Sequence, residues 1–128
     1  MSGTAPFVIK GSLSVTTESA LTGARKGLTD SSEATIFTFN TDTIKSCSIN
    51  FAAFQTAAQN GSDDKSMFTR VDVVSDGTSV FLTEYGTVAT DDEFITFDAS
   101  ISDGVVSVKA TPSGGNATAE MYIESYNT

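Results

Sequence analysis

The sequence predicts an all-β protein, a single antiparallel β-sandwich of about eight or nine strands, on the strength of three observations. Two Asp-Gly pairs, Asp76-Gly77 and Asp103-Gly104, each lie between runs in which apolar and polar residues alternate. Asp-Gly favours a type I′ hairpin turn, because both central residues of that turn need a positive φ. Ten glycines, two prolines and many serines and threonines give a composition that is typical of strands joined by tight turns.

The hairpin around Asp103-Gly104 sorts its side chains into two chemically distinct faces. If the pair forms a two-residue turn, one face is apolar and the other carries hydroxyl groups with the opposite charges of Asp98 and Lys109. The apolar pairs are Ile101–Val106, Ala99–Val108 and Phe97–Ala110. A slip by one residue would turn every apolar side chain to the wrong face, so the pairing register is well specified.

The hairpin around Asp76-Gly77 sorts its residues in the same way. As a two-residue turn it predicts the pairs Val73–Val80 and Val71–Leu82 on the apolar face and Arg70–Thr83 on the reverse face.

The remaining elements follow from the same alternation. Strands are expected at residues 7–15, 35–39, 44–54, 67–75, 79–85, 94–101, 105–111 and 117–126. Residues 18–33 are expected to form a long loop, with a short helical turn at residues 19–24 left open. Alanines near residue 55 leave open a very short helix before the loop at residues 60–64. We expect one domain over residues 1–128, immunoglobulin-like or jelly-roll-like, with a short flexible N-terminal arm at residues 1–6.

The charge of the chain excludes several classes of partner. The formal net charge is −9 and the pI is about 4.1, which opposes binding to nucleic acid and to anionic membranes. No segment approaches the roughly 20 apolar residues of a membrane span, and the first residues lack the pattern of a secretion signal. We therefore expect a complete gene product that is made and kept in the cytoplasm of the cell that produces it.

The residues that usually carry catalysis or bind metal are scarce. The sequence has no histidine and one cysteine, Cys47, which alternates with Ile49 and Phe51 and is expected to be a small buried apolar residue. Its densest acidic run, Asp91-Asp92-Glu93, matches no calcium-loop spacing and is expected to be a solvated turn. We expect no enzymatic activity, metal or cofactor, although a carboxylate-based glycosidase remains an alternative.

Four aromatic residues fall on the polar faces of predicted strands. Phe81 and Tyr85 point away from the apolar face of their strand, and Tyr122 and Tyr126 do so on the last strand. If these faces are exposed, the four residues are candidates for an interface patch. The alternative, which we expect because aromatic residues are mostly buried, is that another hairpin or the long loop covers them.

Three stretches resemble a known protein family. The stretches are FNTDTIKS at residues 39–46, VVSDGTSVFLTEYGTV at 73–88 and TFDASISDGVVSVKATP at 96–112. They are similar to a β-sandwich module of structural proteins in tailed phages, notably phages that infect marine cyanobacteria. The resemblance covers roughly residues 35–126 and implies a virion protein of the capsid surface, tail or fibre, without catalytic residues.

We therefore expect a capsid decoration or cement protein that binds the outer capsid surface, with a tail-fibre or tail-associated host-binding module as the alternative. Its expected partner is the major capsid protein, a homo-oligomer is left open, and its location is the virion, assembled in the host cytoplasm. Candidate interface residues include Ser2 and Phe7 of the N-terminal arm, which can order on a partner. The basic pair Arg25-Lys26, placed in the long loop, is expected to meet acidic capsid surface.

Overall fold

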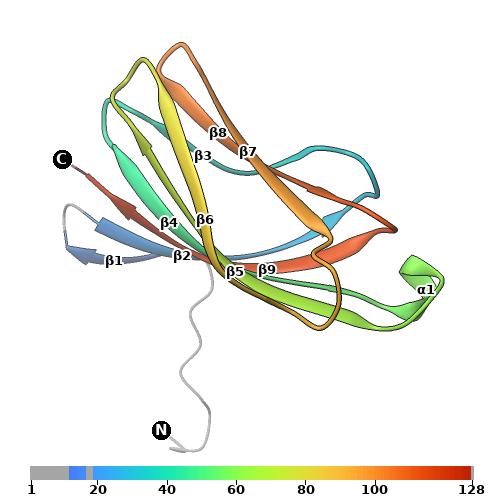
Figure 1. Cartoon of the computed structure of the whole chain (residues 1–128). Helices are drawn as coiled ribbons and strands as arrows, with labels where there is room; N and C mark the ends of the chain where they lie inside the picture. The colour runs from blue at the N-terminus through green and yellow to red at the C-terminus, as the bar shows by residue number, and fades with distance from the viewer. Residues whose placement is uncertain (1–11, 17–18, 128) are drawn as a thin grey trace, which may run out of the picture.

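Two antiparallel β-sheets packed face to face make up the protein (Figure 1). The computed structural model describes residues 12–16 and 19–127, in which the six-stranded sheet has the order β1-β2-β9-β4-β5-β6 and the three-stranded sheet the order β3-β8-β7. The strands are β1 (Ser12–Thr16), β2 (Ser19–Leu28), β3 (Ala34–Asn40), β4 (Ser46–Gln55), β5 (Lys65–Ser75), β6 (Val80–Ala89), β7 (Ile95–Ser102), β8 (Val105–Pro112) and β9 (Ala117–Tyr126). The β-sandwich prediction is confirmed. The N-terminal arm, with Ser2 and Phe7, lies outside the described residues.

The core lies between the two sheets, where alternate side chains of β4, β5, β8 and β9 are buried. Cys47, Ile49 and Phe51 of β4 are at most 1% exposed, as the alternation predicts. The ring of Phe51 meets that of Phe97 from the opposite sheet edge-on, with centroids 4.9 Å apart. Burial raises the pKa of the Cys47 thiol to about 12, so this group stays protonated at neutral pH.

The two Asp-Gly hairpins differ in their turns. Asp103 and Gly104 have φ values of 50° and 75°, and the predicted pairing of β7 with β8 is confirmed. The predicted pairing around Asp76-Gly77 is wrong by two residues, since Val73 pairs with Leu82. The Asp76 carboxylate accepts hydrogen bonds from the backbone N–H groups of Thr78 and Ser79, which holds a four-residue loop. A shift by two residues keeps every side chain on its predicted face.

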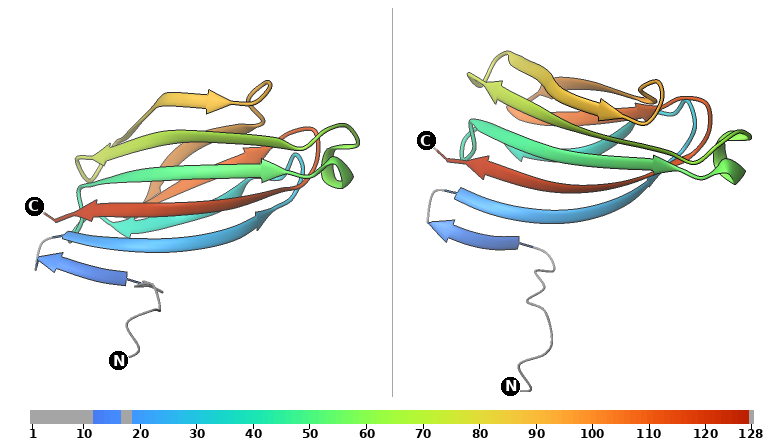
Figure 2. Two further views of the ribbon diagram at one scale, coloured as in Figure 1. Left: turned by 90° about the horizontal axis from the view of Figure 1, so that it is seen from below. Right: turned by 60° about the horizontal axis from the view of Figure 1, so that its bottom comes forward.

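The expected long loop at residues 18–33 is also a wrong prediction, because most of it is the strand β2. β2 pairs along its whole length with β9, from Ser19 with Tyr126 to Leu28 with Ala117. Hydrogen bonding to β9 overrides the weak strand preference of this Gly- and Ser-containing segment. β2 lies beside β9 in the six-stranded sheet (Figure 2). As a result, Arg25 and Lys26 lie in a strand and point to opposite faces of the sheet.

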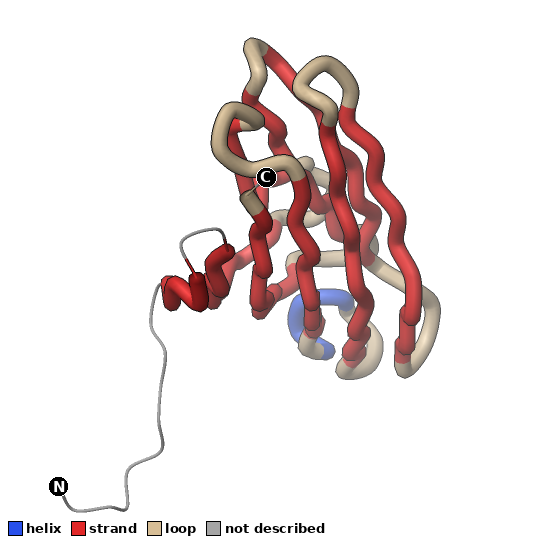
Figure 3. The backbone as a smooth tube through the Cα atoms, turned by 90° about the vertical axis from the view of Figure 1, so that its left-hand side faces the viewer, coloured by secondary structure: helices blue, strands red, loops and turns tan. Residues whose placement is uncertain are grey.

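The helix left open after β4 forms only one turn, α1 (Ala57–Asn60). Thr56 and Gln59 form a capping box at its start, and Gly61 ends it with a φ of 72°. This turn closes one end of the sandwich (Figure 3).

Candidate functional site

The two outer faces of the sandwich differ in chemistry. The outer face of the three-stranded sheet carries mostly hydroxyl side chains, among them Thr35, Thr96 and Ser100. The outer face of the six-stranded sheet carries seven large apolar side chains that are each at least 40% exposed. These seven residues, which we call the aromatic face, are Phe68, Val74, Phe81, Tyr85, Val88, Tyr122 and Tyr126. An exposed apolar surface of this extent is typical of an interaction site.

The aromatic face is built by pairing across neighbouring strands, which lie side by side in Figure 2. Val74 of β5 pairs with Phe81 of β6, and Phe68 pairs with Val88 further along the same two strands. Because residues paired across strands share a face, each pair forms a continuous apolar strip. The two strips lie at opposite ends of the strands, with polar rows between them.

The polar rows centre on a network of Arg70, Asp72 and Ser48. The Ser48 hydroxyl donates to Asp72 Oδ1 at 2.7 Å, and Arg70 Nε donates to the same oxygen at 3.0 Å. The Arg70 guanidinium also lies 5.3 Å from the ring centroid of Tyr85, at cation–π distance. Burial alone would raise the pKa of Asp72. The hydrogen bonds from Ser48 and Arg70, together with the charge of Arg70, outweigh burial, so the pKa of Asp72 lies below its usual value. The network therefore holds its side chains in one arrangement at neutral pH.

A shallow hollow lies at each end of this network. The first, of about 370 Å³, is lined by Val74, Phe81, Tyr126 and Asp72 among others. The Tyr126 hydroxyl donates to Glu124 Oε2 at 2.6 Å, which orients its ring and raises its pKa. We call this the first hollow.

The second hollow, of about 380 Å³, is lined by Ala52, Phe54, Phe68 and Val88 among others. Arg25 forms an ion pair with Glu120, and its guanidinium lies 5.6 Å from the centroid of the Phe54 ring. The charge of Arg25 therefore interacts with Glu120 and with the Phe54 ring beside this hollow, and Arg25 is not a free cation in a loop.

The charges on the outer face of the six-stranded sheet nearly cancel. It carries Arg25, Arg70, Asp72, Glu120 and Glu124, which together contribute −1 to the net charge of −9. The rest of the negative charge therefore lies elsewhere, so this face presents only a weak electrostatic barrier to a neutral or acidic partner.

The structure brings together four of the predicted interface residues and separates the others. Phe81, Tyr85, Tyr122 and Tyr126 all lie on the aromatic face, exposed by 63%, 45%, 56% and 40%. The expectation that another hairpin or the long loop covers them is wrong, since the expected loop is itself a strand of the same sheet. Of the basic pair, only Arg25 projects from the outer face, whereas Lys26 lies on the opposite side with Ala119 as its cross-strand neighbour. Neither residue is placed as predicted.

Three residues that complete the two apolar strips were not predicted from the sequence: Phe68, Val74 and Val88. Phe68 and Val74 alternate with the buried residues Met67, Val71 and Val73, and Val88 lies between the partly buried Thr87 and Ala89, so the period of two indicated their outward orientation. The cation–π contact of Arg70 with Tyr85 was also not predicted, because the predicted register placed Thr83 opposite Arg70.

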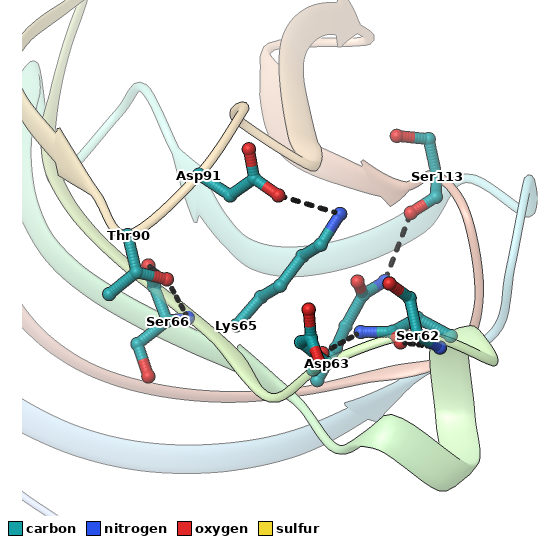
Figure 4. A network of polar contacts seen from close by, with 9 residues as sticks. Ser62, Asp63, Lys65, Ser66, Thr90, Asp91 and Ser113 are labelled. Atoms are coloured by element: carbon teal, nitrogen blue, oxygen red, sulfur yellow. Dashed lines mark hydrogen bonds and ion pairs between the residues drawn. The ribbon is translucent and has the colours of Figure 1, made fainter.

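The carboxylates at the α1 end of the sandwich take part in local contacts (Figure 4). Lys65 Nζ lies 3.6 Å from Asp91 Oδ2, and the backbones of Ser66 and Thr90 hydrogen-bond to each other nearby. No group of three or more His, Cys, Asp or Glu residues within residues 12–16 and 19–127 is arranged to hold a metal ion. In the same ranges, no helix is long and apolar enough to cross a membrane.

No protein-family model matches the sequence, and no curated protein matches it. Three solved structures of phage tailspike proteins resemble the fold. The tailspike protein gp49 of Acinetobacter baumannii bacteriophage Fri1, described as a capsular polysaccharide depolymerase, matches 91% of this chain with a TM-score of 0.55 and 13% identity. The tailspike proteins of Acinetobacter phages vB_ApiP_P1 and AM24 both match with a TM-score of 0.48, at 17% and 11% identity and over 81% and 86% of this chain. The chain spans only 22%, 27% and 19% of the vB_ApiP_P1, AM24 and Fri1 proteins.

Proposed function

We propose that this chain is a structural module of a phage particle, associated with the tail, and that its aromatic face binds protein of the same particle. The observation that carries the proposal is the aromatic face, where seven large apolar side chains stay exposed beside a network of fixed polar groups. Aromatic and arginine side chains of this kind dominate the binding energy of protein interfaces.

The position on the tail is supported by the fold. A similar fold occurs within the Fri1 tailspike protein, which matches with a TM-score of 0.55 and of which this chain spans 19%. The sequence stretches at residues 39–46, 73–88 and 96–112, which resemble phage structural modules, support a particle protein independently of that fold.

Binding, rather than catalysis, is the proposed activity. The three carboxylates on the outer face of the six-stranded sheet are engaged by neighbouring side chains, Asp72 by Ser48 and Arg70, Glu120 by Arg25, and Glu124 by Tyr126. These contacts orient the side chains of the face, and a pre-ordered surface loses less entropy on binding.

A capsid decoration protein is the second candidate. Its supporting observation is the breadth of the six-stranded sheet that carries the aromatic face, because a broad sheet surface suits contact with a shell.

The test is to locate the chain on purified particles. Immunoelectron microscopy with an antibody against the chain should label tails, and the copy number should match a tail component. Label over the shell, with a copy number that matches the capsid lattice, would instead support the second candidate. Absence of the chain from purified particles would refute both.

A variant series then tests the aromatic face. Phe81→Glu and Tyr122→Ala change residues that are 63% and 56% exposed, so both variants should fold normally but enter particles poorly. Val105→Glu is the matched control, because Val105 is also exposed, at 37%, but lies on the three-stranded sheet. Equal incorporation of all three variants would contradict the assignment of the face.

A further inference from the structure

We infer that the partner of the aromatic face is a second copy of this chain, packed face to face about a twofold axis that runs across the strands. This inference rests on the proposed assignment of the aromatic face as an assembly surface, and it names the occupant. It follows from the order of side chains along β5 and β6, from the charges of the face and from its area.

The order of side chains along the strands is the first argument. From one end of β5 and β6 to the other, the face presents an apolar row (Val74 and Phe81), a row with Asp72, a row with Arg70, and a second apolar row (Phe68 and Val88). A twofold axis that passes across the strands between Asp72 and Arg70 reverses this order in the second copy.

That reversal brings complementary groups together. Val74 and Phe81 of one copy face Phe68 and Val88 of the other, so the first hollow of each copy lies against the second hollow of its partner. Asp72 of one copy faces Arg70 of the other, and the same contact occurs twice. The alternation of apolar, acidic, basic and apolar rows is therefore self-complementary.

Charge is the second argument. The chain has a net charge of −9, which opposes self-association over most of its surface. Arg25 and Arg70 offset two of the three carboxylates on the outer face of the six-stranded sheet. A second copy, which is itself strongly acidic, can therefore approach through this face with little repulsion.

Area is the third argument. Five of the six strands, β2, β9, β4, β5 and β6, are ten or eleven residues long. At about 3.4 Å per residue and about 4.8 Å between strands, their face measures roughly 800 Å². A specific interface buries about 800 Å² per partner, so one sheet face is large enough for a stable dimer.

The experiment measures the oligomeric state of the purified chain by sedimentation velocity up to millimolar concentration. Wild type should form a dimer. Phe81→Lys and Val88→Glu place a charge in each apolar row, at positions 63% and 69% exposed, so the monomer should keep its fold, as circular dichroism can verify. Because each substitution acts twice in a twofold dimer, each should raise the dissociation constant by at least about a hundredfold. Val105→Glu, on the three-stranded sheet, should leave it unchanged.

Mixing the two charged variants tests the arrangement itself. In a mixed dimer, Lys at position 81 of one copy faces Glu at position 88 of the other, while Val88 and Phe81 form the native contact at the second site. The mixture should therefore dimerise although neither variant does so alone. A mixture that stays monomeric would overturn the reversed packing.

The outcomes also separate this inference from the proposed function. A wild-type chain that is monomeric at millimolar concentration, or a dimer insensitive to both charged substitutions, would overturn the second-copy inference. If such a monomer still enters particles and its Phe81→Lys variant does not, the aromatic face binds a different virion protein and only this inference fails. A dimer that is absent from particles would instead refute the proposed function and leave the dimer standing.

Discussion

The side chain of Gln55 provides the sharpest test of how this fold is held together. Gln55, the last residue of β4, is 2% exposed, and its Nε2 donates to the carbonyl oxygens of Ser113 at 2.9 Å and Gly115 at 3.1 Å. The amide thus ties the end of β4, beside the second hollow, to the loop between β8 and β9. Both bonds come from one NH₂ group, so a single substitution removes them together.

The expected cost of Gln55→Leu follows from the two acceptors. The Gly115 carbonyl is in a buried position and would lose its partner, which costs about 1–3 kcal/mol. Ser113 is exposed, so water can replace part of its bond, and its loss costs about 1 kcal/mol. We expect Gln55→Leu to lower the free energy of unfolding by about 2–4 kcal/mol in urea denaturation.

A second variant separates hydrogen bonding from packing. Gln55→Glu keeps the shape but directs a carboxylate at two carbonyl oxygens, so it should be the less stable variant at neutral pH. When protonated it can donate to one carbonyl, so the folded state should raise its pKa, and its stability should increase as pH falls. A loss below about 0.5 kcal/mol in Gln55→Leu, or a Gln55→Glu variant with no greater acid stabilisation than wild type, would refute the reasoning.

Three further predictions concern other parts of the fold. Gly115→Ala should lower the free energy of unfolding by about 2–4 kcal/mol, because an added Cβ would lie 2.2 Å from the carbonyl oxygen of Gln59 at a φ of +148°; Gly27→Ala, whose Cβ would meet nothing within 4 Å, is the control in thermal unfolding. Glu84 has a pKa raised above 4.5 by burial and by the charge of Glu93; stability should therefore fall as pH rises through that pKa, and Glu84→Gln should remove this loss in unfolding curves measured across pH. Cys47, 1% exposed with a pKa of about 12, should react with a thiol reagent only at the rate of unfolding, and rapid labelling of the native protein would contradict its burial.

The part of the fold that local rules determine could be predicted from the sequence. The Asp103-Gly104 turn sets the register of β7 with β8, and the alternation of Cys47, Ile49 and Phe51 indicates the buried face of β4. These features depend on side chains a few residues apart, so the sequence contains the information directly.

The features that depend on distant partners could not be predicted in this way. β2 is a strand because β9, almost a hundred residues later, supplies its hydrogen bonds. The loop at Asp76 is longer than expected because its carboxylate caps two backbone N–H groups, a choice that Asp-Gly alone does not fix.

Exposure of the aromatic face was missed for a different reason. A period of two shows that Phe81 and Tyr122 point away from the core, but it does not show whether a further layer covers them. Whether a further layer covers these side chains depends on how the segments are distributed between the two sheets. Here the segment expected to cover the face, residues 18–33, contributes β2 to the same sheet.

The distribution of charge affects which surfaces of the chain can associate with a second copy. Seven exposed apolar side chains on one sheet would ordinarily risk unlimited aggregation. The chain keeps most of its net charge of −9 away from that face, so contact through its acidic surfaces is repulsive. A twofold contact buries the aromatic face of both copies. The outer face of the three-stranded sheet, which stays exposed, carries mostly hydroxyl side chains, so the assembly closes at two. The acidic composition therefore does not recruit a partner; it disfavours association through the acidic surfaces, whereas Arg25 and Arg70 offset most of the acid on the aromatic face.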